Sequence, residues 1–333
     1  LPMYLLALDS TGTQEYIFGS NRLRHNIGAS HLVARATGRW ALEAAQKAAS
    51  PRRTNVKDAD TLELQDSGDP TYWIEEYDDI GAEVLYAGGG NVVVLFREEQ
   101  VANKFRRHLS HLLIERAPEL TLVENGQPFD WEATADEDAG STPILSKALD
   151  TALRDLGRKK EARRVPPRPV NRSVTRSGQI HGQPAIAMQD PPREADDDEE
   201  PYPISAEAKA KEKYLHRANK RLKKLLPPPG DYAYPFELGK LGQAEGEQSF
   251  VAVVHADGDR MGKRLQKVAR NSTPEETGGP NRAFIQRMHE FSEVVREAAL
   301  DAMKDVIEEL HGFIRDHRDG NEVELPGVEA PLR

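Results

Sequence analysis

Two carboxylates separated by a single glycine follow an apolar run late in the sequence. Residues 250–256 form a short apolar run of the kind that becomes a buried strand, and Asp257 and Asp259 come directly after it. A carboxylate at the C-terminal end of a buried strand lies where strand-to-helix turns bind ligands. Because a pair of carboxylates there can hold Mg²⁺ through oxygen atoms, these residues predict a magnesium-binding turn.

The residues between and after these carboxylates suit a phosphate group. Gly258 allows backbone N–H groups to approach a phosphate closely, and Gly262 and Lys263 continue that cradle. The alternative interpretation is an ordinary Asx-type turn that caps a helix. Since no GxxxxGK[ST] segment occurs in the chain, a nucleotide would have to bind without a P-loop.

A glycine-rich turn in the first third of the chain is the second candidate for ligand binding. The turn consists of Gly88, Gly89, Gly90 and Asn91, and a β-rich run flanks it on each side. Because glycine accepts positive φ values, this pattern predicts a hairpin. A turn without side chains lets a flat or phosphorylated ligand lie against the backbone, although without a carboxylate it cannot ligate a metal as an acidic turn would. The alternative is a simple tight hairpin.

A third candidate lies near the N-terminus. Asp9 follows an apolar strand pattern just as Asp257 does, so the two α+β parts look like distant copies of one unit. Further along, the small residues Gly28 and Ala29 allow close packing, and the hydroxyl of Ser30 offers a contact to a ligand. The alternative for these small residues is plain helix packing.

Hydrophobic periodicity places these residues in an α+β protein. In the first part we expect a strand over 4–9, a hairpin over 83–96 and a helix over 98–113. A helical stretch is expected to carry Ile27, Leu32, Val33, Trp40, Leu42 and Ala45. In the last part, residues 282–317 predict one long helix with Phe284, Met288, Phe291, Val295, Ala299 and Met303 on one face.

The middle of the chain is dominated by charge. Residues 154–176 hold nine basic residues, and residues 190–201 are acidic, flanked by prolines and unable to bury a core. A basic amphipathic helix is predicted over 204–226, and prolines end it. Its cationic side chains suit an RNA backbone or an acidic partner surface, and the alternative is a solvated face. The candidate contacts are Lys220, Arg221, Lys223 and Lys224.

Composition excludes several classes of protein. The 333 residues include no cysteine, which excludes disulfides, thiolate zinc sites and cysteine nucleophiles. The net charge of -10 argues against a general nucleic-acid coat. No window of about 18 apolar residues occurs, so we expect a cytoplasmic protein without a membrane partner.

Taken in order, these motifs resemble the large, polymerase/cyclase-like subunit of type III CRISPR-Cas effector complexes, the Cmr/Csm large subunit family. The matching segments are Gln14-Glu15-Tyr16-Ile17-Phe18, Leu23-Arg24, Gly28-Ala29-Ser30, Ala87-Gly88-Gly89-Gly90-Asn91 and His255-Ala256-Asp257-Gly258-Asp259-Arg260-Met261-Gly262-Lys263. The resemblance implies an α+β protein with two ferredoxin-like palm domains, related to nucleotidyl cyclases and GGDEF proteins, that bind two ATP molecules. It implies a first palm over 1–125, a linker region over 126–246 and the start of a second palm over 247–333.

On this resemblance the chain converts ATP to cyclic oligoadenylate when target RNA binds. Asp257 and Asp259 are then the catalytic residues, with Asp257 as the ligand of Mg²⁺ or Mn²⁺. The nucleotide-binding residues implied are Ser30, Gly88, Gly89, Gly90, Asn91, Gly258, Gly262 and Lys263. The partners implied are the guide RNA, the target RNA and other subunits of the effector.

Two departures from the family keep an alternative open. No GGDD segment occurs in the chain, so we expect the second palm to be truncated near Arg333, before that hairpin. Residues 173–188 look like a zinc-ribbon segment whose cysteines have been replaced, and no zinc is expected. The alternative function is a catalytically silent palm-fold scaffold that binds guide RNA and other subunits. A free-standing diguanylate-type cyclase is a further alternative.

Overall fold

The computed structural model divides into two units, each made of three separate segments of the chain. It describes residues 1–133, 143–162, 175–178, 182–191, 200–228, 233–237, 264, 267, 278–312, 314–317 and 320–323. The first unit comprises Leu1–Tyr16, Ser30–Arg168 and Asp259–Val294. The second unit comprises Ile17–Ala29, Pro169–Gly258 and Val295–Arg333. The boundaries after Tyr16, Ala29 and Val294 therefore fall inside three helices.

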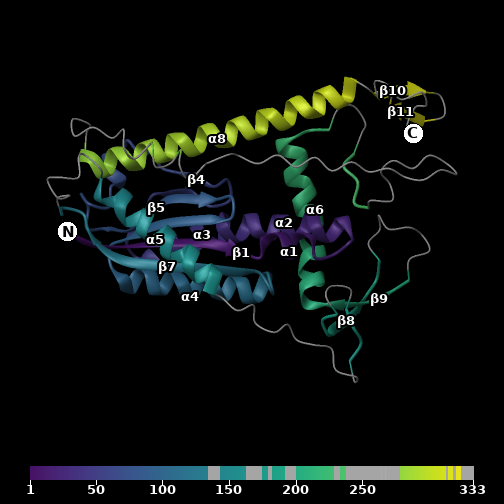
Figure 1. Cartoon of the computed structure of the whole chain (residues 1–333), viewed down its shortest axis with the longest axis horizontal. Helices are drawn as coiled ribbons and strands as arrows, with labels where there is room; N and C mark the ends of the chain where they lie inside the picture. Colours follow the sequence, from purple (N-terminus) through teal and green to yellow (C-terminus); the bar gives the residue numbers. More distant parts are fainter. Residues whose placement is uncertain are drawn as a thin grey trace. The chain divides into compact units, whose positions relative to one another are not determined.

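The first unit is built on a mixed sheet of five strands (Figure 1). In order across the sheet they are β2 (Arg53–Thr54), β5 (Ile80–Gly88), β6 (Asn91–Phe96), β1 (Pro2–Thr11) and β7 (Thr121–Asp130). Neighbouring strands are antiparallel except β2 and β5, which are parallel. Along the chain, β1 is followed by α2 (Leu23–Thr37) and α3 (Arg39–Ala49), then by β5, β6, α4 (Glu99–Arg116) and β7. This strand-helix-strand-strand-helix-strand order is that of a ferredoxin-like unit, with β2 added at one edge.

Successive side chains of β1 point to opposite faces of the sheet, and the apolar ones on both faces are buried. Met3, Leu5 and Ala7 join a core that includes α5 (Ile144–Ala162) and the first turns of α8 (Gly279–Gly312); we call this side the α5 face. On the opposite side, the α4 face, the rings of Phe96 and Phe105 lie 5.4 Å apart. The fully buried Trp40 lies on α3, which packs beside α4. A sheet buried on both faces explains why β1 and β6 read as continuous apolar runs.

Several predicted elements are confirmed and one is wrong. Strand β1, the β5–β6 hairpin, α4 and α6 (Ala206–Leu225) all lie where the sequence predicts them. The single helical stretch expected from Ile27 to Ala45 is wrong, because it is two helices separated at Gly38. The backbone carbonyl of Ala34 would lie 2.8 Å from a β-carbon at Gly38, so a larger residue does not fit at this break.

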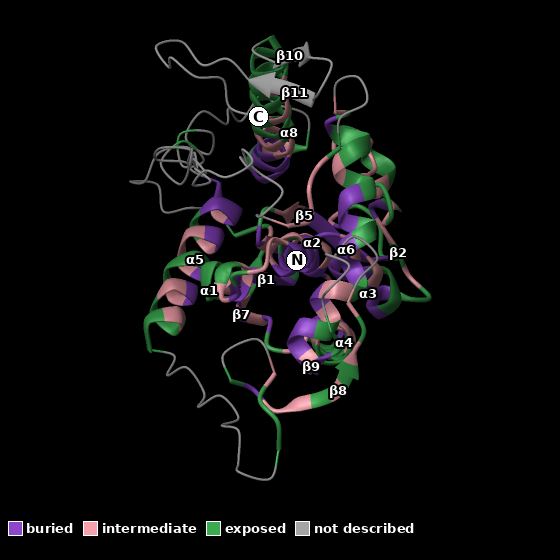
Figure 2. Cartoon of the chain, turned by 90° about the vertical axis from the view of Figure 1, so that its right-hand side faces the viewer, coloured by how far each residue is buried: buried purple, intermediate pink, exposed green. Residues whose placement is uncertain are grey.

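The long C-terminal helix is shorter than predicted. It ends at Gly312, and Ile314–His317 forms β10, which pairs with β11 (Gly320–Val323). Phe284 and Met288 are buried, as the predicted apolar face requires, but Met303 is 49% exposed. Figure 2 shows this far part of α8 as exposed. None of the helices in the described part of the chain is long and apolar enough to cross a bilayer.

In the second unit a small hairpin leads into α6. Strands β8 (Ala185–Gln189) and β9 (Tyr202–Ser205) are antiparallel, and the Ser205 hydroxyl accepts a hydrogen bond from the Ala208 N–H, which caps α6. The start of α2 crosses α6 at Gly28, where a β-carbon would clash with the carbonyl oxygen of Lys211. This crossing agrees with the packing alternative for Gly28.

Candidate functional site

The glycine turn between β5 and β6 has the conformation that the sequence predicts. Gly88, Gly89 and Gly90 all have positive φ, at 149°, 57° and 94°. A β-carbon at Gly90 would lie 2.7 Å from the hydroxyl oxygen of Ser10. The turn is fixed from both sides, because the Ser10 N–H donates to the Gly90 carbonyl at 2.8 Å and the Gly90 N–H donates to the Thr37 hydroxyl at 3.2 Å. Only glycine fits this position.

The end of β1 lies beside this turn. Asp9 pairs in register with Asn91, so the strand that carries the carboxylate and the glycine turn meet at one edge of the sheet. The hydroxyl of Thr13 donates to that of Ser10 at 3.0 Å. This edge therefore presents backbone, hydroxyl, amide and carboxylate groups together.

A lysine from α5 completes this edge, and sequence reasoning missed its role. Lys160 forms an ion pair with Asp9 and donates to the Ser10 carbonyl at 2.9 Å. Both side chains are about three-quarters buried, at 27% and 25% exposure. The only signal in the sequence is membership of the basic run over 154–176, which does not single out Lys160.

The donors at this edge suit a phosphate better than a divalent cation. The carboxylate of Asp9 is already paired with an ammonium group, and Asn91 stands opposite it with a neutral amide. Within the described ranges, no three histidine, aspartate or glutamate side chains are grouped to hold a metal ion. Lys160 and the hydroxyls of Ser10 and Thr13 can instead face an anionic oxygen.

Tyr86 lies over the same turn. A β-carbon at Gly89 would lie 3.1 Å from its hydroxyl oxygen. Burial raises the pKa of the Tyr86 phenol, which keeps it protonated and able to donate a hydrogen bond. Tyr86 was not among the predicted residues, since in the sequence it reads as one more member of a β-rich run.

Of the other residues predicted to bind nucleotide or metal, the structure describes one. Ser30 is exposed on α2. Asp257, Gly258, Asp259, Gly262 and Lys263 lie outside the described residues, as does the strand predicted before them. The structure therefore describes the glycine turn but leaves the acidic turn as a prediction.

The predicted basic residues Lys220, Arg221, Lys223 and Lys224 are exposed near the end of α6. The carboxylates of this helix are buried instead. Glu207 pairs with Lys211 at 2.6 Å, and Glu212 lies 2.8 Å from the imidazole Nε2 of His25. Apart from the buried Lys211, the cations of α6 are thus exposed, whereas its carboxylates are largely buried.

A buried polar cluster joins α2 to α6, and it was not predicted. The hydroxyl of Ser20 lies 2.7 Å from Nδ1 of His25, and the Tyr202 hydroxyl donates to Glu212 at 2.6 Å. The guanidinium of Arg24 lies 2.6 Å from Glu237. Ser20 and His25 are buried, so this Ser-His-Glu arrangement is closed to a substrate and instead orients Glu212.

Hydrogen bonds hold the segment that resembles a cysteine-free zinc ribbon. The Gly178 N–H donates to the Gln183 carbonyl at 2.6 Å, and Ser177 forms a β-bridge with Pro184. The Gln183 amide donates to the buried Glu207 at 2.9 Å. Hydrogen bonds therefore link the described residues of this segment to one another and to Glu207 of α6.

A buried arginine fixes α8 to the sheet of the first unit. Arg282 donates to Glu83 at 2.6 Å and to Glu75 at 3.0 Å, and its guanidinium lies 4.8 Å from the ring centroid of Trp73. Burial alone would lower the pKa of Arg282, but the charges and hydrogen bonds of Glu83 and Glu75 outweigh burial and raise it. The guanidinium is thus a permanent charge inside the α5 face.

Comparisons with known proteins give distant structural matches. No protein-family model and no curated protein matches this sequence. The chain is similar to solved structures of a Csm1-Csm4 cassette in complex with pppApA, at 12% identity, and in its apo form, at 13% identity, both with a TM-score of 0.30. A third match, to the cassette in complex with AMPPNP, has 11% identity and a TM-score of 0.29. Each match covers 48% of this chain and only 19% of the other.

Proposed function

We propose that this chain is a nucleotide-binding, palm-type subunit of a type III CRISPR RNA-guided effector, which makes cyclic oligoadenylate from ATP. The observation that carries the proposal is the meeting of the glycine turn with Asp9, Ser10 and Lys160 at one edge of a ferredoxin-like sheet. A bare turn beside hydroxyls and an ammonium group suits a triphosphate. The assignment to this family in the proposal rests on the order of the sequence motifs.

In this proposal the two palms have different tasks. The first palm, over 1–125, holds one ATP through Gly88–Asn91, with Lys160 near its phosphates and Ser30 as a further contact. The second palm begins at 247 and carries Asp257 and Asp259 as the catalytic residues, with Gly258, Gly262 and Lys263 near the second triphosphate. Mg²⁺ or Mn²⁺ held by Asp257 would neutralise phosphate charge and favour attack of a 3′-hydroxyl on the α-phosphate.

A substitution at Gly90 tests the nucleotide site. Gly90→Val puts a branched side chain into a position with φ of 94° and 2.7 Å from Ser10, so it should weaken binding of a fluorescent ATP analogue by about tenfold or more. Gly157→Ala on α5 is the matched control, because nothing lies within 4 Å of its added β-carbon. Equal affinity in both variants and the wild type would remove the turn from the site.

A catalytically silent scaffold remains the second candidate function. The neutral Asn91 opposite Asp9 and the ion pair that Lys160 forms with Asp9 favour it, because both leave this end of β1 without a free carboxylate pair. ATP turnover by the RNA-loaded complex separates the two functions. The synthase requires turnover that Asp257→Ala abolishes, whereas the scaffold shows none in either form.

A further inference from the structure

The exposed charged side chains of α6 are all cationic. The exposed charged residues of this helix are Lys209, Lys213, Arg217, Lys220, Arg221, Lys223 and Lys224; we call them the α6 stripe. Successive members three or four residues apart lie on one side of a helix. From Lys209 to Lys224 the stripe is about 22 Å long at 1.5 Å per residue. In the described part of the chain, no ion pair involves a member of the stripe.

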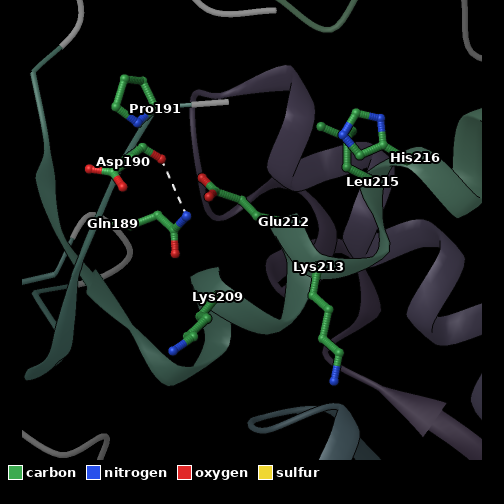
Figure 3. A pocket seen from close by; sticks show the side chains of 8 residues that line it. All are labelled: Gln189, Asp190, Pro191, Lys209, Glu212, Lys213, Leu215 and His216. Carbon is green, nitrogen blue, oxygen red and sulfur yellow. Dashed lines mark hydrogen bonds between the residues drawn. The ribbon is translucent and has the colours of Figure 1, made fainter. Parts of the chain in front are cut away.

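A pocket of about 440 Å³ opens at the N-terminal end of this stripe (Figure 3). One side is formed by Gln189, Asp190 and Pro191, where β8 ends, and the other by residues of α6 that include Lys209 and Lys213. Its volume is within the range of sites that enclose a small ligand, about 300–1,000 Å³. Cations of the stripe thus border a cavity large enough for one nucleotide.

A buried network orients one acceptor in this pocket. The hydroxyl of Tyr202, the imidazole of His25 and the guanidinium of Arg24 all approach the same oxygen of Glu212, Oε1, at 2.6, 2.8 and 3.4 Å. The Glu212 side chain is only 12% exposed. In Figure 3 its carboxylate is directed toward Gln189 and Asp190. The network therefore fixes the orientation of the Glu212 carboxylate at the pocket, where it can accept a hydrogen bond from a ligand.

The combination of groups selects the ligand class. Lys209 and Lys213 attract an anion, but the carboxylates of Asp190 and Glu212 in the same pocket repel the acidic side chains of a peptide. A nucleobase has N–H groups that donate to these carboxylates, and its flat faces suit Pro191 and the ring of His216. A nucleotide suits both the lysines and the carboxylates, because its phosphate is an anion and its base carries N–H donors.

We propose that this pocket takes the base of one unpaired nucleotide of a single-stranded RNA whose phosphates follow the α6 stripe. The choice of RNA over DNA rests on the proposed function. The stripe supplies affinity without sequence preference, and the pocket supplies a preference for bases that carry an amino group. The two parts can therefore be changed separately.

Fluorescence anisotropy with RNA strands of about 12 nucleotides tests the stripe. The double variant Lys213→Glu and Lys220→Glu should weaken binding at least tenfold and reduce the slope of log K against log salt, since each lost phosphate contact removes about 0.7 from it. Lys104→Glu, at an exposed position on α4, is the control for a change in charge and should bind as the wild type does. Equal binding by all three proteins would overturn the proposal.

Base preference tests the pocket. We expect strands of cytidine to bind about threefold or more tighter than strands of uridine, and Gln189→Leu with Asp190→Asn to remove that difference while keeping the salt slope. Absence of a preference in the wild type would overturn the pocket assignment. Stronger binding of poly-glutamate than of RNA would point to an acidic protein partner and overturn the whole inference.

ATP-analogue binding in the same proteins separates this inference from the proposed function. If the wild type binds the ATP analogue but no RNA, this inference falls and the nucleotide site of the first palm stands. If RNA binds as expected and the Gly90 variant keeps its affinity for ATP, the nucleotide site falls instead. If neither ligand binds the wild type, both proposals fall.

Discussion

Lys160 is the residue whose contacts say most about the glycine turn. It places a positive charge next to Asp9 and the Ser10 carbonyl, which are oxygen groups of the kind that can bind a metal ion. A site with its own ammonium group can attract a phosphate without a metal. This residue therefore decides between an anion site and a metal site at the edge of the sheet.

We predict that Lys160→Met weakens binding of the ATP analogue by about tenfold, because a hydrogen bond to a charged group contributes about 1.5 kcal/mol. Titration of a fluorescent analogue measures the change. Lys159→Met is the matched control, since Lys159 precedes it on α5 and donates only to the Glu124 carbonyl at 3.1 Å. Identical affinities for both variants would assign Lys160 a structural role alone.

Among the described side chains of the first unit, we expect Arg282 to contribute most to stability. Arg282→Met would leave Glu75 and Glu83 buried without their cation, so the free energy of unfolding should fall by about 3–5 kcal/mol. All three tryptophans, Trp40, Trp73 and Trp131, belong to the first unit, so urea denaturation followed by their fluorescence reports on this unit. The exposed Arg107→Met is the control, and a loss as small as its own would contradict the prediction.

His289 should make the first unit sensitive to acid. Burial lowers the pKa of its imidazole below the ordinary value of 6.5, although Glu83 attracts its charged form. Below pH 6.5 the imidazole binds a proton in the unfolded chain but stays neutral in the folded chain. The free energy of unfolding therefore decreases as the pH is lowered, by up to about 1.4 kcal/mol per pH unit. Unfolding at about pH 7.5 and about pH 5.5 measures the loss, which His289→Gln should reduce. An equal loss in the variant would assign the effect to other groups.

At the scale of the element, the crossing of α2 and α6 sets a steric limit. Gly28→Ala places a β-carbon against the Lys211 carbonyl of α6, closer than van der Waals contact allows, so the helices must separate to accept it. We expect a cost of about 1–3 kcal/mol to the second unit, measured as faster amide hydrogen exchange in α6. Gly157→Ala has space for its methyl group, so it should be neutral or stabilising. Unchanged exchange in the Gly28 variant would contradict the close crossing.

Elements defined by their own residues were predicted from the sequence. Strand β1 and the β5–β6 hairpin follow from apolar runs around a glycine turn, and α6 follows from its helical period and its prolines. Strand β7 was missed, because its polar residues Asn125 and Gln127 gain their partners only from other segments; the Gln127 amide donates to the Ala148 carbonyl at 2.5 Å. Elements such as β7, whose residues find their partners in segments distant in the sequence, are seen only in the structure.

In the candidate site, too, local features were predicted from the sequence and contacts between distant segments were not. Gly88–Asn91 was predicted because positive φ requires glycine, whatever surrounds the turn. Lys160 and Glu212 were missed, since each contacts a partner more than 140 residues away in the sequence, Asp9 or His25. For the same reason, helical period identified the α6 stripe but not the pocket beside it.

At the scale of the whole molecule, charge is sorted by position. The chain is acidic overall, with a net charge of -10, yet the α6 stripe is cationic along its whole length. Such a stripe gives a polyanion a local attractive surface on a protein whose net charge is negative. This agrees with a defined RNA path rather than a general coat.

The first unit also depends on residues late in the chain. A chain ending at residue 277 would lack Phe284, Ile285 and Met288 of the α5 face as well as Arg282. We expect such a chain to lose the cooperative urea transition seen by tryptophan fluorescence, because the sheet would have one face partly uncovered. A cooperative transition at the wild-type midpoint would show that α8 is dispensable for this unit.

The separation between Arg282 and its partners has a consequence for synthesis on the ribosome. Glu75 and Glu83 emerge 207 and 199 residues before the arginine that neutralises them. At elongation rates of about 5–20 residues per second, the nascent sheet waits about 10–40 s for that partner. During this interval two carboxylates and an apolar face are open to solvent and to chaperones. The first unit can thus begin to fold early in synthesis, but it can finish only after Arg282 has emerged.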